Sequence, residues 1–315
     1  MDLTPAPLFT DVHPGPDGGT AHWAVTSDDK RIRVGAWPLQ GAKGTVLLFP
    51  GRTEYIEKYG VTARDLAKRG LATLSIDWRG QGLADRLLPD PLVGHVESFP
   101  DYQKDVAALM RAARSLGMPR PFFLLAHSMG ACIGLRAVME GLPVQSAAFT
   151  GPMWGIQIKP HLRLVAKVLT NVMPRLGKGH LLPPGTTSEP YVQAAPFEDN
   201  MLTTDAEMYD MMRDQIAAHP ELSLGGPSYV WLREALAETK HLASRAAPNL
   251  PAAVWLGTRE RIVSTPPIHE RMEKWKGGRL HLVEGGEHEV LMETEALRTP
   301  ILDGAEKLFK ATVTS

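Results

Sequence analysis

The sequence has little cysteine, no long apolar run and almost no net charge. Cys132 is the single cysteine in 315 residues, which excludes an internal disulfide and is typical of a reducing compartment. No stretch reaches the roughly 18 apolar residues of a membrane-spanning helix, and residues 1–20 lack the basic and apolar regions of a secretory signal. We therefore expect a soluble, cytoplasmic protein in which Cys132 is a small buried residue.

The charge balance excludes another set of functions. The chain has 34 basic and 35 acidic residues, for a formal net charge of −1, so it lacks the basic surface of a nucleic-acid-binding protein. Its 11 histidines show no metal-binding cluster, and no glycine-rich phosphate loop precedes a helix. We expect no metal, no cofactor and no nucleic-acid partner. The length allows one large α/β domain with an insertion, or two ordinary domains.

Short apolar runs alternate with stretches of helical periodicity. The runs are residues 45–49, 71–76, 122–125, 146–150, 252–256 and 280–283, and the expected helices include 59–69, 102–116, 267–275 and about 300–309. These runs are too continuous for half-exposed strands, so they indicate a mainly parallel sheet with helices on both faces, typical of the α/β class. Segments 22–26 and 32–37 flank a turn signal and predict an antiparallel hairpin, after an irregular lead-in over residues 1–20.

The strand signal disappears between residues 151 and 245. This stretch has helical periodicity broken by proline- and glycine-containing loops. It predicts a helical cap over the C-terminal ends of the strands, where open α/β sheets bind ligands, with a core domain of residues 1–150 and 246–315. The alternative is an ordinary second domain of packed helices. Apolar residues of the insertion either line an acyl pocket or form its core; they include Met153, Trp154, Met201, Met208, Met211, Met212 and Trp231.

A serine lies at an expected strand-to-helix corner. The sequence AHSMG, residues 126–130, follows the apolar run at 122–125 and precedes a helix-forming stretch. Such a nucleophile elbow strains the serine backbone and needs small residues on both sides, here Ala126 and Gly130. Ala126 stands where the usual GxSxG pattern has glycine, and its methyl group is still small. A five-residue pattern recurs often by chance, so the remaining sequence must decide.

The partners that a serine nucleophile needs follow in the expected order. Serine requires a base within hydrogen-bond reach and a third group that orients the base. In hydrolases of this architecture the order is Ser, then Asp or Glu, then His. Glu260 follows the run 252–256, and His288 follows the run 280–283. The sequence therefore predicts Ser128 as nucleophile, His288 as base and Glu260 as acid.

Acyl transfer also needs donors for the developing oxyanion. The amide after the nucleophile, that of Met129, supplies one. The loop after the first parallel strand supplies the other, and Gly51 allows a turn that directs the Arg52 amide into the site. For the Arg52 side chain we expect an ion pair with Glu54 or Glu57. The alternative is contact with a phosphate or carboxylate of the substrate.

Nine segments together resemble one group of enzymes. They are PGRTEYIEKYG, DWRGQGLAD, GHVESFPDYQKDV, AHSMGA, GPMWGI, NMLTTDAEMYD, LGGPSYVWLREA, GTRERIV and EGGEHEVLMETEALR. From about residue 46 to 309 the chain resembles the α/β-hydrolase group that contains lysophospholipase L2 and monoacylglycerol lipases. This resemblance implies an α/β-hydrolase fold of eight strands with a helical cap, no cofactor, the same triad and the same oxyanion amides. Glu260 and Pro50 resemble the lysophospholipase side of the group, because many monoacylglycerol lipases have aspartate and histidine there.

The sequence thus predicts a serine hydrolase that cleaves carboxylic esters of single-chain acyl lipids through an acyl-enzyme. Its partner would be a small ester or a lysolipid, and exposed apolar residues in the cap would favour a transient contact with a membrane surface. One alternative is a carboxylesterase for short-chain or xenobiotic esters, an amidase or an acyltransferase. Another is a catalytically silent hydrolase-fold binding protein.

Overall fold

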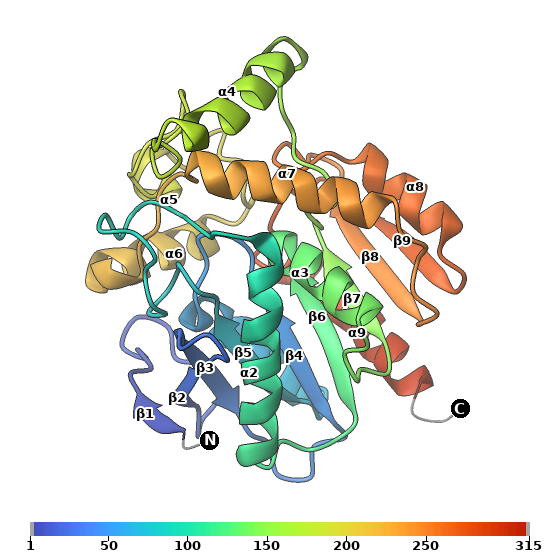
Figure 1. Cartoon of the computed structure of the whole chain (residues 1–315). Coiled ribbons are helices and arrows are strands. Elements are labelled where there is room, and N and C mark those ends of the chain that lie inside the picture. Colours follow the sequence, from blue (N-terminus) through green and yellow to red (C-terminus); the bar gives the residue numbers. More distant parts are fainter. Residues whose placement is uncertain (1–2, 313–315) are drawn as a thin grey trace.

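A computed structural model describes residues 3–312, which form one mixed sheet covered by helices (Figure 1). The strand order among these residues is β1-β2-β3-β5-β4-β6-β7-β8-β9. The strands are β1 (Thr4–Ala6), β2 (Thr20–Val25), β3 (Arg31–Trp37), β4 (Thr45–Phe49), β5 (Ala72–Asp77), β6 (Phe122–His127), β7 (Ala147–Thr150), β8 (Ala252–Gly257) and β9 (Gly278–Val283). Strands β4 to β9 run parallel, and β1 to β3 are antiparallel to their neighbours.

The mostly parallel sheet expected from the sequence is confirmed, with one strand more than the eight expected. The additional strand is β1, in the lead-in that was expected to be irregular, where Pro5 pairs with His22 of β2. Proline is tolerated here because β1 is a short strand at the sheet edge, where a missing N–H costs no ladder hydrogen bond. The prolines and glycines of this segment hide the alternating pattern that would have indicated a strand.

Helices cover both faces of the sheet. They are α1 (Gly60–Lys68), α2 (Tyr102–Ser115), α3 (Ser128–Met139), α8 (Pro266–Lys274) and α9 (Glu295–Ala311), with 3₁₀ turns η1 (Ile56–Tyr59) and η2 (Phe99–Asp101). Successive residues of β4 point to opposite faces. Val46 and Leu48 belong to the core that includes residues of α1 and α9, whereas Leu47 and Phe49 belong to the core formed with α2, α3 and α8.

The segment between β7 and β8, which we call the inserted segment (residues 151–251), contributes no strand to the sheet. It contains η3 (Pro160–Leu162), α4 (Arg163–Arg175), α5 (Tyr191–Ala194), α6 (Ala206–Ala218), η4 (Pro220–Leu222) and α7 (Tyr229–Ala243). Helix α7 crosses above α3 and the central strands, and α4 packs on α7 on the side away from the sheet (Figure 1). None of the helices within residues 3–312 is long and apolar enough to cross a membrane.

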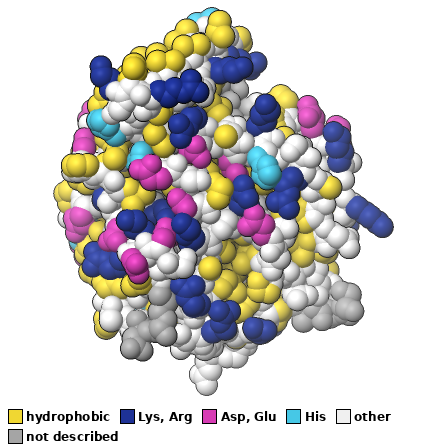
Figure 2. Space-filling model, viewed as in Figure 1, with side chains coloured by type: hydrophobic (Ala, Val, Ile, Leu, Met, Phe, Trp, Pro, Cys, Tyr) yellow, Lys and Arg dark blue, Asp and Glu magenta, His cyan; other side chains and the backbone are white. Residues whose placement is uncertain are grey.

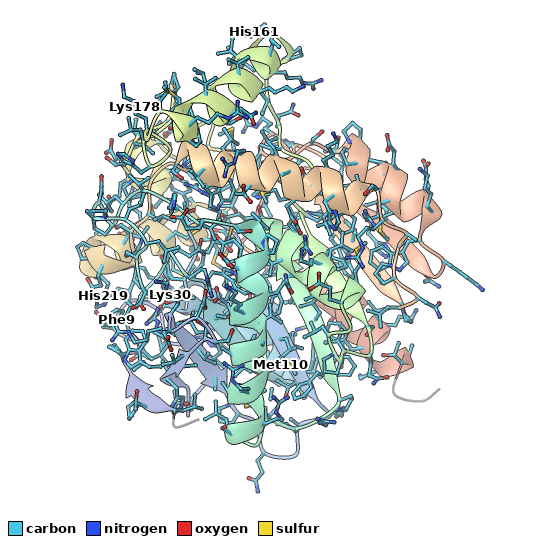
Figure 3. The ribbon with its side chains drawn as sticks, viewed as in Figure 1. Phe9, Lys30, Met110, His161, Lys178 and His219 are labelled. Carbon is cyan, nitrogen blue, oxygen red and sulfur yellow. The ribbon has the colours of Figure 1, made fainter. Side chains whose placement is uncertain are left out.

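The lead-in ties the N-terminal strands to the inserted segment. The ring of Phe9 stacks on that of His219, with centroids 3.7 Å apart (Figure 3). His219 Nε2 also lies 2.8 Å from a carboxylate oxygen of Asp11. These contacts hold the end of α6 against the start of the chain.

Candidate active site

Ser128 lies at a sharp corner between β6 and α3. Its φ angle is +49°, a left-handed conformation that costs energy for any residue except glycine. Gly130 makes the corner possible, because a Cβ there would lie 2.2 Å from the carbonyl oxygen of Phe49 and 2.4 Å from that of Pro50. Ala126 is fully buried beside it. The small residues seen in the sequence therefore have a steric reason.

The structure brings together the three residues that the sequence placed in a triad. His288 Nε2 lies 2.9 Å from Ser128 Oγ, and His288 Nδ1 lies 2.7 Å from Glu260 Oε2. Each residue follows the C-terminal end of a different parallel strand, β6, β8 or β9. The second oxygen of Glu260 accepts hydrogen bonds from the amides of Ile262 and Val263, at 2.7 and 3.0 Å. These bonds fix the carboxylate while its other oxygen faces the imidazole.

The electrostatics of the pair favour an ionised Glu260 and a basic His288. Burial alone would raise the pKa of Glu260, but the charge and hydrogen bond of His288, with two backbone amides, lower it below its usual value. Burial would likewise lower the pKa of His288, but the carboxylates of Glu260, Glu289 and Glu54 outweigh it and raise the pKa above 6.5. An imidazole of raised pKa is a stronger base for a hydroxyl proton.

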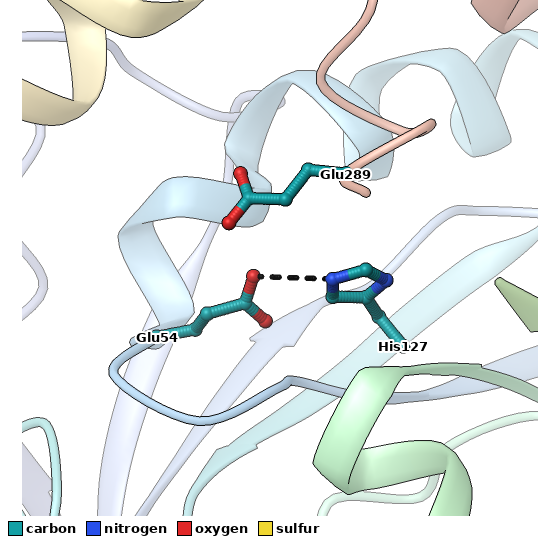
Figure 4. Close-up of side chains that lie close together, drawn as sticks. All are labelled: Glu54, His127 and Glu289. Atoms are coloured by element: carbon teal, nitrogen blue, oxygen red, sulfur yellow. Dashed lines mark ion pairs between the residues drawn. The ribbon is translucent and has the colours of Figure 1, made fainter. Parts of the chain in front are cut away.

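Figure 4 shows a second buried cluster, which lies beside the triad because the rings of His127 and His288 are 4.7 Å apart. Ligand-type atoms of Glu54, His127 and Glu289 lie within 4.8 Å of one another, a spacing that metal ligands also adopt. Lys58 Nζ, however, lies 2.8 Å from Glu54 and 2.6 Å from Glu289, so an ammonium group already supplies the positive charge there. Burial lowers the pKa of His127 to about 3, which keeps its ring neutral. Its contact with Glu54 at 3.8 Å therefore does not join two charged groups.

The loop after β4 is held in place by side chains from the segment that follows β5. Trp78 Nε1 donates to the carbonyl oxygen of Pro50 at 2.9 Å, and Gln81 Nε2 donates to that of Gly51 at 2.8 Å. Within residues 3–312 the Arg52 amide has no hydrogen-bond acceptor. The amide of Met129 is in the first turn of α3, where the helix offers no acceptor. Both amides expected to bind an oxyanion are therefore available.

The Arg52 side chain does not form the ion pair expected from the sequence. Glu54 pairs with Lys58 one helical turn away, and Glu57 pairs with Arg33 at 2.7 Å. The expectation was wrong because sequence proximity suggested the glutamates as partners of Arg52, whereas the fold gives each of them another cation. The guanidinium instead contacts the inserted segment.

A pocket of about 510 Å³ opens at the candidate triad, between the core and the inserted segment. Of the apolar residues named from the sequence, Met153, Met201 and Trp231 line it. Trp154 instead packs against the rings of Phe149 and Trp275. Further apolar lining residues carried no sequence signal that separates pocket from core; they are Ile156, Leu202, Leu224, Leu232, Ile262 and Val263.

Met208 and Met212 are not among the lining residues of this pocket either. Both are buried on α6 and belong to the core that also includes Tyr209 and Ile216. Their helical spacing reflects packing of the inserted segment, the alternative considered from the sequence. Met212 also lines a smaller cavity of about 50 Å³, which shares Leu202 and Glu289 with the pocket.

Comparison with known proteins shows the family of the chain. The family described as serine aminopeptidase, S33, matches residues 40–295. Lysophospholipase L2 of Escherichia coli (strain K12) is 32% identical over 293 residues, covering 90% of this chain and 85% of the relative. The probable lysophospholipase L2 of Haemophilus influenzae is 27% identical over 268 residues, covering 84% and 83%.

Solved structures share the fold at low sequence identity. A soluble variant of monoglyceride lipase from Saccharomyces cerevisiae, in complex with a substrate analog, aligns with a TM-score of 0.70 at 18% identity and covers 92% of this chain and 94% of its own. A thermostable carboxyl esterase from Bacillus coagulans aligns with a TM-score of 0.71 at 14% identity, covering 95% and 100%. The chain belongs to the α/β-hydrolase family described as serine aminopeptidase, S33, in the group that contains lysophospholipase L2 and monoglyceride lipases.

Proposed function

We propose that the protein is a carboxylic ester hydrolase that cleaves single-chain acyl lipids with a Ser128-His288-Glu260 triad. The observation that carries the proposal is the position of His288, whose two ring nitrogens lie 2.9 Å from Ser128 Oγ and 2.7 Å from Glu260. This is the arrangement that activates a serine hydroxyl. The relation to lysophospholipase L2 of Escherichia coli supports a lipid ester as the substrate.

The first half of the reaction forms an acyl-enzyme. Ser128 Oγ attacks the ester carbonyl carbon while His288 Nε2 takes the hydroxyl proton, and Glu260 stabilises the imidazolium that results. The carbonyl oxygen becomes an oxyanion, which the amides of Arg52 and Met129 bind. The intermediate then collapses, His288 gives its proton to the leaving alcohol, and the acyl group stays on Ser128.

The second half returns the enzyme to its starting state. A water molecule attacks the acyl carbon, His288 accepts one of its protons, and the same two amides bind the second oxyanion. When the carbon–Oγ bond breaks, His288 returns the proton to Ser128 and the fatty acid leaves. No other reagent is needed for the balance of atoms and charge.

The apolar lining of the pocket suits an acyl chain. Its lining includes Ile156, Leu202 and the flexible thioethers of Met153 and Met201. We further propose that residues 151–245 act as a cap over a core of residues 1–150 and 246–315. In support, the inserted segment supplies lining residues such as Met201 and Trp231 opposite the triad.

The outer side of the cap supports a transient contact with a membrane surface. Seven of the nine exposed large apolar side chains in the described part of the chain lie on or next to α4: Leu162, Leu164, Val165, Val168, Val172, Leu176 and Leu181. The same stretch exposes Lys159, Arg163, Lys167, Arg175 and Lys178, and residues 141–188 contain no Asp or Glu. Apolar and basic side chains thus share the upper edge in Figure 2, between His161 and Lys178 in Figure 3.

Such a face fits an anionic bilayer, since apolar groups enter the interface while basic groups meet lipid phosphates. We expect the protein to sediment with phosphatidylglycerol vesicles more than with phosphatidylcholine vesicles. The double variant Leu164→Ser, Val168→Ser should weaken this binding at least several-fold. Val25→Ser removes an exposed valine on β2 and serves as the control. Equal binding of the double variant and the wild type would contradict the membrane contact.

The enzymatic proposal is tested by a substrate series with two variants. A series of p-nitrophenyl esters, followed by lysophosphatidylcholine and a monoacylglycerol, should show a preference for long acyl chains. Ser128→Ala should lower kcat by several orders of magnitude, as triad deletions do in other serine hydrolases. Ser98→Ala changes a serine outside the pocket lining and is the matched control. Full activity of Ser128→Ala would overturn the assignment, and a preference for the shortest esters would favour a carboxylesterase.

A further inference from the structure

Arg52 carries a charge for which the protein provides no counter-ion. Its Nη2 donates to the carbonyl oxygen of Gly225, and its guanidinium carbon lies 5.3 Å from the centre of the Trp231 ring. Its Nε is buried and has no hydrogen-bond partner within residues 3–312. Because a guanidinium has five N–H donors, the protein uses only part of its hydrogen-bonding capacity.

The surroundings keep this group charged but leave it uncompensated. Burial lowers the pKa of Arg52 to about 10, and the nearby Tyr102 opposes the shift only partly, so the group stays protonated at neutral pH. No carboxylate of the described residues forms an ion pair with it, since Glu54 and Glu57 are paired elsewhere. A buried cation without a partner is unfavourable. An anion that reaches the guanidinium would relieve that cost.

Arg52 lines the same pocket as the proposed nucleophile and base. Two other charged lining residues, Glu54 and Glu289, share Lys58 as their cation, and Glu189 is exposed to solvent. Arg52 is the one lysine or arginine among the described residues that line the pocket. Arg52 is therefore the cation of the pocket wall that has no carboxylate partner among the described residues.

We propose that the Arg52 guanidinium binds the phosphate of a lysophospholipid head group while the acyl ester of the same molecule lies at Ser128. The inference rests on the proposed function and adds the substrate class. A planar guanidinium can donate two parallel hydrogen bonds to phosphate oxygens. In a lysophospholipid, one glycerol unit carries both the ester and the phosphate, so both groups enter the pocket together.

This contact separates two lipids that share the same ester. A monoacylglycerol has no phosphate, so the cation gives it no added binding energy. A phosphate contact made equally in the bound substrate and in the transition state lowers KM and leaves kcat unchanged. We therefore expect Arg52 to act on KM for lysophospholipids and to determine the preference between the two lipid classes.

The test compares 1-oleoyl lysophosphatidylglycerol with 1-oleoylglycerol, each below its aggregation concentration. The readout is kcat/KM for the lysophosphatidylglycerol divided by kcat/KM for 1-oleoylglycerol. A disturbed loop around the Arg52 amide would lower both values, and its effect would cancel in this ratio. Arg52→Gln should lower this ratio roughly 10- to 100-fold, the value of a charge-assisted hydrogen bond, mainly through KM. Arg52→Lys should restore part of it. Arg213→Gln removes an exposed arginine on α6 and should leave the ratio unchanged.

An unchanged ratio in Arg52→Gln would overturn the proposal and assign Arg52 to the contact between core and cap. A second measurement separates the head group from a free anion. Glycerol 3-phosphate should inhibit 1-oleoylglycerol hydrolysis by the wild type more than inorganic phosphate does, and stronger inhibition by inorganic phosphate would contradict a head-group site. Failure of the triad is recognised independently, because it would appear as activity of Ser128→Ala on both lipids.

Discussion

Replacing Glu260 by glutamine tests the orientation of His288 with a change of a few atoms. In the wild type one oxygen of Glu260 accepts from the amides of Ile262 and Val263, and the other faces His288 Nδ1 at 2.7 Å. The two amides will hold the single carbonyl oxygen of glutamine, so its NH₂ group must face Nδ1. His288 Nδ1 then has to accept the hydrogen bond from this NH₂ group. The ring proton therefore moves to Nε2, which faces Ser128.

An imidazole with its proton on Nε2 cannot accept the serine proton. The corresponding change in a serine protease triad lowers kcat about 10⁴-fold, which equals roughly 5.4 kcal/mol of transition-state stabilisation. We expect a similar loss for Glu260→Gln in kcat on a p-nitrophenyl ester, with an unchanged melting temperature. Glu284→Gln, an exposed residue at the end of β9, is the control and should be fully active. A loss of less than about tenfold in a folded Glu260→Gln protein would refute the reasoning.

Three further predictions follow from the same region. The kcat/KM for a neutral ester should rise with pH through an apparent pKa above 6.5, because only neutral His288 accepts a proton and its pKa is raised; a midpoint below 6 would contradict the burial and charge described. Gly130→Ala should lower the free energy of unfolding by about 1–3 kcal/mol or more, since its Cβ would lie within 2.4 Å of two backbone oxygens; an unchanged urea midpoint would exclude that clash. Lys58→Met should cost roughly 3–5 kcal/mol in the same assay, because Glu54 and Glu289 would stay buried without a cation, and wild-type stability would show that the cluster does not depend on it.

The fold was predictable because its signals are local. Each parallel strand is a short apolar run bounded by turn residues, and the expected run 45–49 coincides with β4. The order of Ser128, Glu260 and His288 along the chain was informative because parallel strands bring their C-terminal ends to one edge. Strand β1 was missed because its three residues contain a proline and pair only at the sheet edge.

Side-chain partners were less predictable because they depend on packing between distant segments. Proximity in the sequence suggested an ion pair between Arg52 and Glu54. Lys58, however, lies one turn beyond that glutamate, is buried with it and forms the ion pair instead. Met208 and Trp231 both lie on helices of the inserted segment, yet only Trp231 lines the pocket. Helical periodicity identifies an apolar face and does not identify what covers it.

The central claim, an activated hydroxyl at residue 128, is tested most directly by stoichiometric labelling with a fluorophosphonate followed by peptide mass analysis. We predict one phosphonyl group per chain, attached to Ser128, with activity lost in proportion to labelling and no adduct on Ser128→Ala. Labelling of a different serine, or full activity of a protein completely labelled at Ser128, would contradict the account.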